Sequence, residues 1–180
     1  MAKIFDKAAL TVYLKEEGFL AARALPLNPW DHVDNLGRVR GKTPRDSDWP
    51  RRQYKLNDVY KWLDRSGNLG IRLLESDLVF DFDPRNMDMS LEEAVTALDI
   101  EFGMDLANAP TVRTGSGGLH IYAQIPPQFQ GIKLRNEIEG YKGVEFKSAG
   151  RQVVAAGSRR PNGGMYKFLP GKRPLTKRPT

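Results

Sequence analysis

Residues 78–102 read LVFDFDPRNMDMSLEEAVTALDIEF, a strand pattern followed directly by a helix pattern. From Phe80 to Asp83, aromatic and acidic side chains alternate, which is the period of a strand with one buried face. Leu91–Phe102 has apolar side chains at helical spacing, and Ser90 with Glu93 matches a capping box at its start. This succession predicts a fold that packs helices on a sheet.

Short apolar segments of period two predict the other strands. They lie at Leu69–Leu74, Leu119–Ile125, Val144–Phe146 and Gln152–Ala155, in addition to Leu78–Asp83. The segment Glu75–Asp77 is short enough to join Leu69–Leu74 and Leu78–Asp83 as a hairpin. We therefore expect an α+β domain with a largely antiparallel or mixed sheet and helices on one side.

The chain that precedes these strands predicts two helices, a strand and a long loop. Helical spacing of apolar side chains predicts a first helix over residues 5–17. Phe19–Leu25 has the composition of a strand, which Pro26 would end. The proline-rich residues 27–53 are expected to form a long structured loop, and a second helix is expected with Asn57 as its N-cap.

Composition is that of an ordinary globular protein. The 180 residues suffice for one domain, 40% of them are apolar, and the mean hydropathy is −0.51. No apolar run approaches the roughly 18 residues that span a bilayer, and no signal-type block follows Met1, so we expect a cytoplasmic protein with no membrane partner. The chain has no cysteine, and its histidines are His32 and His120, so oxygen must be the main ligand of any metal.

Charge is distributed unevenly along the chain, whose pI is about 9.6. Residues 1–145 contain 22 acidic and 19 basic side chains, whereas residues 146–180 contain nine basic side chains and no acidic one. Clustered positive charge favours a nucleic-acid partner, because neutralising phosphates releases counterions. We expect a domain over residues 1–170 and a basic tail or linker over residues 171–180, which would either remain solvated or contact DNA.

Asp81 and Asp83 project from one face of their strand because side chains alternate. Two like charges on one face repel each other, and a hard divalent ion such as Mg²⁺ or Mn²⁺ would compensate that repulsion. The alternative is an exposed strand end, where Asp83-Pro84 opens the next turn. This pair alone leaves both interpretations open.

The turn Thr114-Gly115-Ser116-Gly117-Gly118 leads into a strand that begins Leu119-His120. Glycines allow a phosphate to approach the backbone closely, and Ser116 adds a hydroxyl group. His120 lies on the polar face of the strand. A plain hairpin and a structural histidine are the alternatives, and the adjacency of the two features favours a phosphate site.

Glu145 and Lys147 share one face of the strand Gly143–Lys147. An acid and a cation two residues apart commonly pair on a solvated surface. Alternatively, Glu145 completes a three-carboxylate metal site and Lys147 steadies a triphosphate.

The order of these motifs resembles the bifunctional DNA primase/polymerase (prim-pol) domain of the archaeo-eukaryotic primase superfamily, which occurs in phages, plasmids and mobile elements. The resemblance extends from about Ala8 to Phe168. It rests on the ordered series Gly18-Phe19, Leu25-Pro26, Gly41–Pro44 with Trp49, Asn68–Ile71, Val79–Asp83, Arg113–His120, Gly143–Lys147 and Val153–Ser158.

The resemblance implies a role for each matching residue. Asp81 and Asp83 match the first catalytic motif, and Glu145 matches the third acidic position, where the family more often has Asp. These carboxylates would hold two Mg²⁺ or Mn²⁺ ions. The groups implied to bind the incoming nucleotide are Ser116, Gly117, Gly118, His120 and Lys147. The basic residues Arg151, Arg159, Arg160 and Lys167 are further candidates for contact with DNA.

The implied fold is an RRM-like catalytic sheet beside a smaller N-terminal α/β unit. The implied activity is nucleotidyl transfer, in which (d)NTPs extend a 3′-hydroxyl on a DNA template by two-metal phosphoryl transfer. A helicase domain or protein is an implied partner. Two other classes fit part of the pattern: a noncatalytic replication initiator module that binds DNA or nucleotides, and another Asp-x-Asp metal enzyme such as a nuclease or a nucleotide-sugar transferase.

Overall fold

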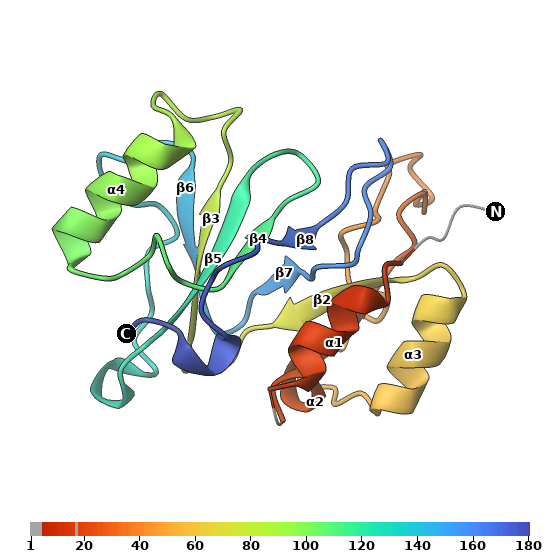
Figure 1. Cartoon of the computed structure of the whole chain (residues 1–180). Helices are drawn as coiled ribbons and strands as arrows, with labels where there is room; N and C mark the ends of the chain where they lie inside the picture. The colour runs from red at the N-terminus through yellow and green to blue at the C-terminus, as the bar shows by residue number, and fades with distance from the viewer. Residues whose placement is uncertain (1–4, 17) are drawn as a thin grey trace. The chain divides into compact units, whose positions relative to one another are not determined.

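The computed structural model describes residues 5–16 and 18–180, which fold into two compact units, each with its own antiparallel sheet (Figure 1). Unit 1 comprises the described residues up to Arg72 together with Gln152–Lys167, and unit 2 comprises Leu73–Arg151 and Phe168–Thr180. The expected α+β class is confirmed. In the described part of the chain no helix is long and apolar enough to cross a membrane.

Unit 1 packs three helices with a three-stranded sheet of order β1-β2-β7. The helices are α1 (Ala8–Leu14), α2 (Phe19–Arg23) and α3 (Leu56–Asp64), and the strands are β1 (Ala24–Leu27), β2 (Asn68–Arg72) and β7 (Gln152–Val154). Tyr13, Leu25 and Ile71 are fully buried in this unit. The expected long loop is confirmed, since no helix or strand lies between β1 and α3.

The N-terminal elements differ from the expected ones. Phe19–Leu25 is not a strand: its first five residues form α2, and β1 continues through Pro26. A short apolar run is compatible with a buried helix as well as with a strand, and here the Arg23 guanidinium lies 4.4 Å from the Phe19 ring centroid, one helical turn away. Pro26 is tolerated because β1 is an edge strand.

The two expected helices of this region also shift. The first is shorter than residues 5–17, since α1 ends at Leu14, and residue 17 lies outside the described residues. In α3 the N-cap is Lys55 rather than Asn57, so that the helix already begins at Leu56.

Unit 2 is built on a five-stranded sheet of order β6-β3-β5-β4-β8. The strands are β3 (Asp77–Phe82), β4 (Thr111–Arg113), β5 (Leu119–Gln124), β6 (Val144–Lys147) and β8 (Lys167–Phe168), with short 3-10 turns η1 (Pro127–Phe129) and η2 (Leu175–Lys177). Helix α4 (Leu91–Phe102) starts at the expected capping box, in which Ser90 and Glu93 exchange side-chain hydrogen bonds. Phe80 and Phe82 of β3 form one apolar core with Ala94 and Leu98 of α4.

The expected hairpin at Glu75–Asp77 is wrong. β2 pairs with β1 and β7, whereas β3 pairs with β5 and β6, so the turn links two different sheets. Asp77 fixes this turn by accepting a hydrogen bond from the Leu74 backbone N–H and by pairing with Arg178 at 3.1 Å.

Residues 171–180 are part of unit 2 and contact the rest of it. Leu175 is fully buried, the Pro179 carbonyl accepts a hydrogen bond from the Gln124 N–H, and Arg173 pairs with Asp105. The expected domain boundary after residue 170 stays a prediction, although most of this segment's basic side chains have contacts within the unit.

Candidate active site

Strand pairing in unit 2 aligns three polar residues across the sheet. Asp81 of β3 is the register partner of His120 on β5 and of Glu145 on β6. Directly opposed residues of antiparallel strands point to the same face. The sheet therefore brings together, in one row, side chains that lie 25 to 64 positions apart in the sequence.

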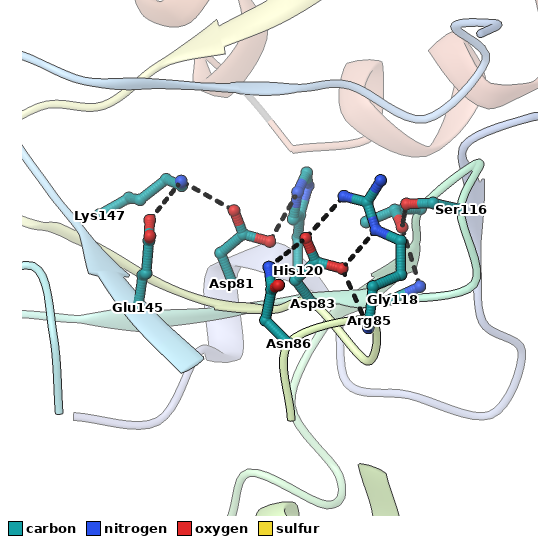
Figure 2. A network of polar contacts seen from close by, with 10 residues as sticks. Asp81, Asp83, Arg85, Asn86, Ser116, Gly118, His120, Glu145 and Lys147 are labelled. Atoms are coloured by element: carbon teal, nitrogen blue, oxygen red, sulfur yellow. Dashed lines mark hydrogen bonds and ion pairs between the residues drawn. The ribbon is translucent and has the colours of Figure 1, made fainter. Parts of the chain in front are cut away.

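Lys147 connects two members of this row. Its Nζ lies 2.8 Å from Asp81 Oδ2 and 3.0 Å from Glu145 Oε2, and His120 Nε2 lies 3.4 Å from the other Asp81 oxygen (Figure 2). We call Asp81, His120, Glu145 and Lys147 the polar row. In it, Asp81 contacts both His120 and Lys147, and Lys147 also contacts Glu145.

Burial and charge compete at the centre of the polar row. The side chains of Asp81, Lys147 and His120 are 23%, 20% and 7% exposed, whereas that of Glu145 is 50% exposed. Burial disfavours the Asp81 carboxylate, but the hydrogen bond and charge of His120, followed by Lys147, outweigh it and hold the pKa of Asp81 well below its usual range. Burial likewise acts against the Lys147 ammonium, but attraction to Asp81 and Glu145 raises the Lys147 pKa. Asp81 and Lys147 are thus both charged at neutral pH.

Asp83 lies two residues after Asp81, directly beyond the end of β3, and has different hydrogen-bond partners. Its carboxylate accepts hydrogen bonds from Arg85 Nε at 2.8 Å, Arg85 Nη2 at 2.6 Å and Asn86 Nδ2 at 3.2 Å (Figure 2). The hydrogen bonds from Arg85 lower the pKa of Asp83 against a weaker effect of burial. Asp83 and Asp81 are therefore both ionised, each beside a different cation.

The glycine turn adjoins the end of β3. A Cβ on Gly118 would lie 2.1 Å from the Phe82 carbonyl oxygen, so only glycine fits there. The Gly118 N–H donates to Thr114 Oγ1 and the Gly117 N–H to the Thr114 carbonyl. Because both amides are used inside the turn, Ser116, whose hydroxyl lies 3.1 Å from Thr114 Oγ1, is the predicted phosphate ligand that requires the least rearrangement.

A large groove borders the polar row within unit 2. It has a volume of about 1320 Å³, and its lining includes Asn86 and residues 133–145. Four cations, Lys133, Arg135, Lys142 and Arg151, and four acids, Asp88, Glu137, Glu139 and Glu145, line it, so that its lining carries both signs of charge. A groove of this size can hold a nucleotide beside Glu145.

Sequence reasoning missed several groups at this site. Arg85 and Asn86, which bind Asp83, directly follow the Asp83-Pro84 turn, and an Asx-type turn was the available signal. Lys133, Arg135 and Lys142 lie in a segment with no strand or helix pattern, so nothing in the sequence placed them beside Glu145.

The predicted DNA contacts are divided between the two units. Arg151 lines the groove of unit 2, and Lys167 is exposed at the start of β8. Arg159 and Arg160 belong to unit 1, where the Nε atoms of both are buried without a hydrogen-bond partner among the described residues. Their role in DNA binding stays a prediction.

Oxygen donors for a divalent cation are present, but in the described residues no group of three or more acidic or histidine side chains is arranged as a metal site. Asp81, Asp83 and Glu145 supply carboxylate oxygens, the donors that Mg²⁺ and Mn²⁺ prefer. Lys147 and Arg85 now neutralise these carboxylates. The donor chemistry fits a hard cation, provided that the ion takes over contacts now made by these two side chains.

Comparison with protein families identifies a relationship that covers most of the chain. A family model described as bifunctional DNA primase/polymerase, N-terminal, matches residues 18–180. That range includes the whole polar row, Asp83, the glycine turn and the groove. No curated protein matches the chain.

Proposed function

Because this chain belongs to the family of bifunctional DNA primase/polymerase N-terminal domains, we propose that it is a nucleotidyltransferase that extends a 3′-hydroxyl on a DNA template from (d)NTPs. The family supports a primase/polymerase function with DNA and nucleotides as substrates. The observation that carries the assignment of the site is the polar row, in which Asp81 meets Glu145 and His120 across three strands.

We assign Asp81, Asp83 and Glu145 as the ligands of two metal ions, either Mg²⁺ or Mn²⁺. When bound, such ions activate the attacking hydroxyl and neutralise charge on the triphosphate. Asp81 and Asp83 suit this role because their lowered pKa values keep them ionised at neutral pH, and Glu145 suits it because it is half exposed and borders the groove. In the free protein, the cations Lys147 and Arg85 offset the repulsion between these carboxylates.

Lys147 and His120 are assigned to the triphosphate. Lys147 carries a positive charge in a partly buried setting, where a fixed charge interacts more strongly than in water. If Asp81 and Glu145 held a cation, the Lys147 ammonium that now contacts them would be available to phosphate oxygens. His120 Nε2 lies on the same face and can donate to a phosphate when protonated. Ser116 adds a hydroxyl donor from the neighbouring turn.

The wider setting is part of the same proposal. We assign the template and primer to the cations Arg151, Arg159, Arg160 and Lys167, and we place the protein in the cytoplasm, in the replication system of a phage, plasmid or mobile element. A helicase domain or protein would supply the single-stranded template.

The experiment is extension of a fluorescently labelled primer on a DNA template with Mg²⁺ or Mn²⁺ and either dNTPs or NTPs. The proposal expects products longer by single nucleotides, which disappear when a chelator removes the metal. Binding of template and nucleotides with no extension under any of these conditions would instead indicate a noncatalytic initiator module.

A further inference from the structure

Unit 1 carries a second groove, beside α3, whose lining is strongly basic. Its volume is about 400 Å³. Asp58 is the one acidic side chain among the described residues that line it, against five cations: Arg45, Arg52, Lys55, Lys61 and Arg65. We call it the α3 groove. None of its residues belongs to the site in unit 2.

Helix α3 presents this charge on one face. Arg65 follows Lys61 and Trp62 by about one helical turn, and all three line the groove. Val59 and Leu63 are buried in unit 1. The apolar face anchors the helix, so that Lys61 in the helix and Arg65 at its C-cap are held by a packed element, whereas Arg45 and Arg52 come from the loop that precedes it.

One guanidinium of the groove is held in place by an aromatic ring. The Arg45 guanidinium lies 4.9 Å from the Trp62 ring centroid. The ring is itself fixed, because its Nε1 donates to the Leu27 carbonyl at 2.7 Å and a Cβ on Gly67 would lie 2.1 Å from that nitrogen. Trp62 therefore serves as a support for Arg45, whose planar fork matches a phosphate.

A second cation–aromatic pair lines the same groove. The Arg52 guanidinium lies 5.3 Å from the Tyr54 ring centroid, and the Tyr54 hydroxyl donates to Asp46 at 3.0 Å. Asp46 also pairs with Arg45 at 2.9 Å and Arg52 at 3.6 Å. Asp46 thus orients both arginines, and together with Asp48, which lies 3.7 Å from Arg52, it neutralises part of their charge.

The remaining cations are uncompensated. Lys55, Lys61 and Arg65 are exposed, and among the described residues they form no ion pair. Three exposed charges beside two oriented guanidiniums suit a chain of phosphates better than a single small anion. The aromatic rings are engaged by arginines, which favours backbone contact over stacking with bases.

We propose that the α3 groove binds the sugar–phosphate backbone of single-stranded DNA without reading its base sequence. The choice of DNA as the polyanion rests on the proposed function, since a template-directed enzyme must hold a single strand. An acidic peptide is the other class of ligand that such charge would attract, and the experiment separates the two.

The experiment measures binding of a labelled oligodeoxythymidylate to the full chain by fluorescence anisotropy over a range of salt concentrations, without nucleotide or divalent metal. The test variant is Lys61→Gln/Arg65→Gln. Two single variants are compared with each other. Lys61→Gln and its matched control Lys15→Gln each remove one exposed lysine from unit 1, and only Lys61 lines the groove.

The groove predicts that the double variant binds about 10- to 30-fold more weakly near 0.1 M salt and that its slope of log affinity against log salt falls by about 1.4, at about 0.7 per lost phosphate contact. Lys61→Gln should lower the slope by about half as much as the double variant does, and Lys15→Gln should leave the slope unchanged. An oligodeoxyadenylate should behave in the same way.

Equal losses in Lys61→Gln and Lys15→Gln would overturn the proposal, because they would reflect net charge alone. Unchanged DNA binding in the double variant, with loss of polyglutamate binding instead, would assign the groove to an acidic peptide. The binding assay needs no catalysis, so the two proposals can fail separately. If the protein binds DNA through this groove but never extends a primer, the proposed function is refuted and the proposed role of the groove still holds.

Discussion

Lys147 Nζ lies 2.8 Å from Asp81 and 3.0 Å from Glu145, so that one ammonium joins two carboxylates of neighbouring strands. In the free protein this contact offsets the repulsion that two acids in direct register would otherwise cause. The same contact places the lysine in competition with any divalent ion for the same oxygens. Under the proposed function, Lys147 would therefore couple metal binding to nucleotide binding.

Replacement of Lys147 should separate these two effects. Lys147→Met removes the competing cation and keeps most of the side-chain volume, so we expect Mn²⁺ to bind the free protein about tenfold more tightly, which is about 1.4 kcal/mol. Nucleotide affinity should fall, because the ammonium is lost. Calorimetry with Mn²⁺ and then with a nucleotide measures both, and weaker Mn²⁺ binding would show that Lys147 does not compete with the metal.

His120→Gln should affect the nucleotide rather than the metal. Hard ions favour oxygen, and the three carboxylates remain in this variant. We expect about tenfold weaker nucleotide binding and an Mn²⁺ affinity within about twofold of that of the unmodified protein. The same titrations decide the matter, and a large loss of Mn²⁺ affinity would make His120 a ligand or an essential support of Asp81, which it faces at 3.4 Å.

The pKa of Asp81 predicts how its contribution to stability depends on pH. Its pKa is lowered in the folded protein from the ordinary value of 3.8, so folding is favoured by its ionisation above about pH 4. As the pH falls below 4 towards the folded-state pKa, that contribution is lost. Urea unfolding of the unmodified protein and of Asp81→Asn should show a difference in free energy that shifts in favour of the variant as the pH falls from 5 to 3. A difference that does not change down to pH 3 would contradict the ion pairing of Asp81.

Arg178 should matter for the stability of unit 2. It pairs with Asp77, and the two side chains are 8% and 2% exposed. Arg178→Met removes the cation facing a buried carboxylate and should lower the free energy of unfolding by about 3 kcal/mol. Arg173→Met is the control, because its pair with Asp105 is on the surface and is worth at most about 1 kcal/mol. Equal effects of the two variants on urea unfolding would show that residues 171–180 are only a loose tail.

The sequence predicted the elements with strong periodicity and missed those set by long-range pairing. Leu91–Phe102 could be recognised with its cap because every signal lies within that stretch. The strand positions of Asp81 and Glu145 also follow from local alternation. Their direct opposition depends on the register of strands more than sixty residues apart, and no local pattern encodes that register.

The same distinction explains the errors. Phe19–Arg23 is short and apolar, so its periodicity does not separate helix from strand, and contacts such as that of Arg23 with Phe19 decide in favour of the helix. The turn at Glu75–Asp77 has hairpin length, but pairing with distant strands places its two flanks in different sheets. Lys147 could be predicted to lie beside Glu145, whereas its contact with Asp81 could not.

The most direct test of the account is the rate at which a single nucleotide is added to a primed template by Asp81→Asn. This change keeps the size of the side chain and removes the charge at the centre of the polar row. Glu92→Gln, an exposed acid on α4, is the control. The account predicts that Asp81→Asn is at least about 100-fold slower, which is about 2.7 kcal/mol, with the control unchanged. A folded Asp81→Asn variant that adds nucleotides at the rate of the unmodified protein would contradict the assignment of the polar row as the active site.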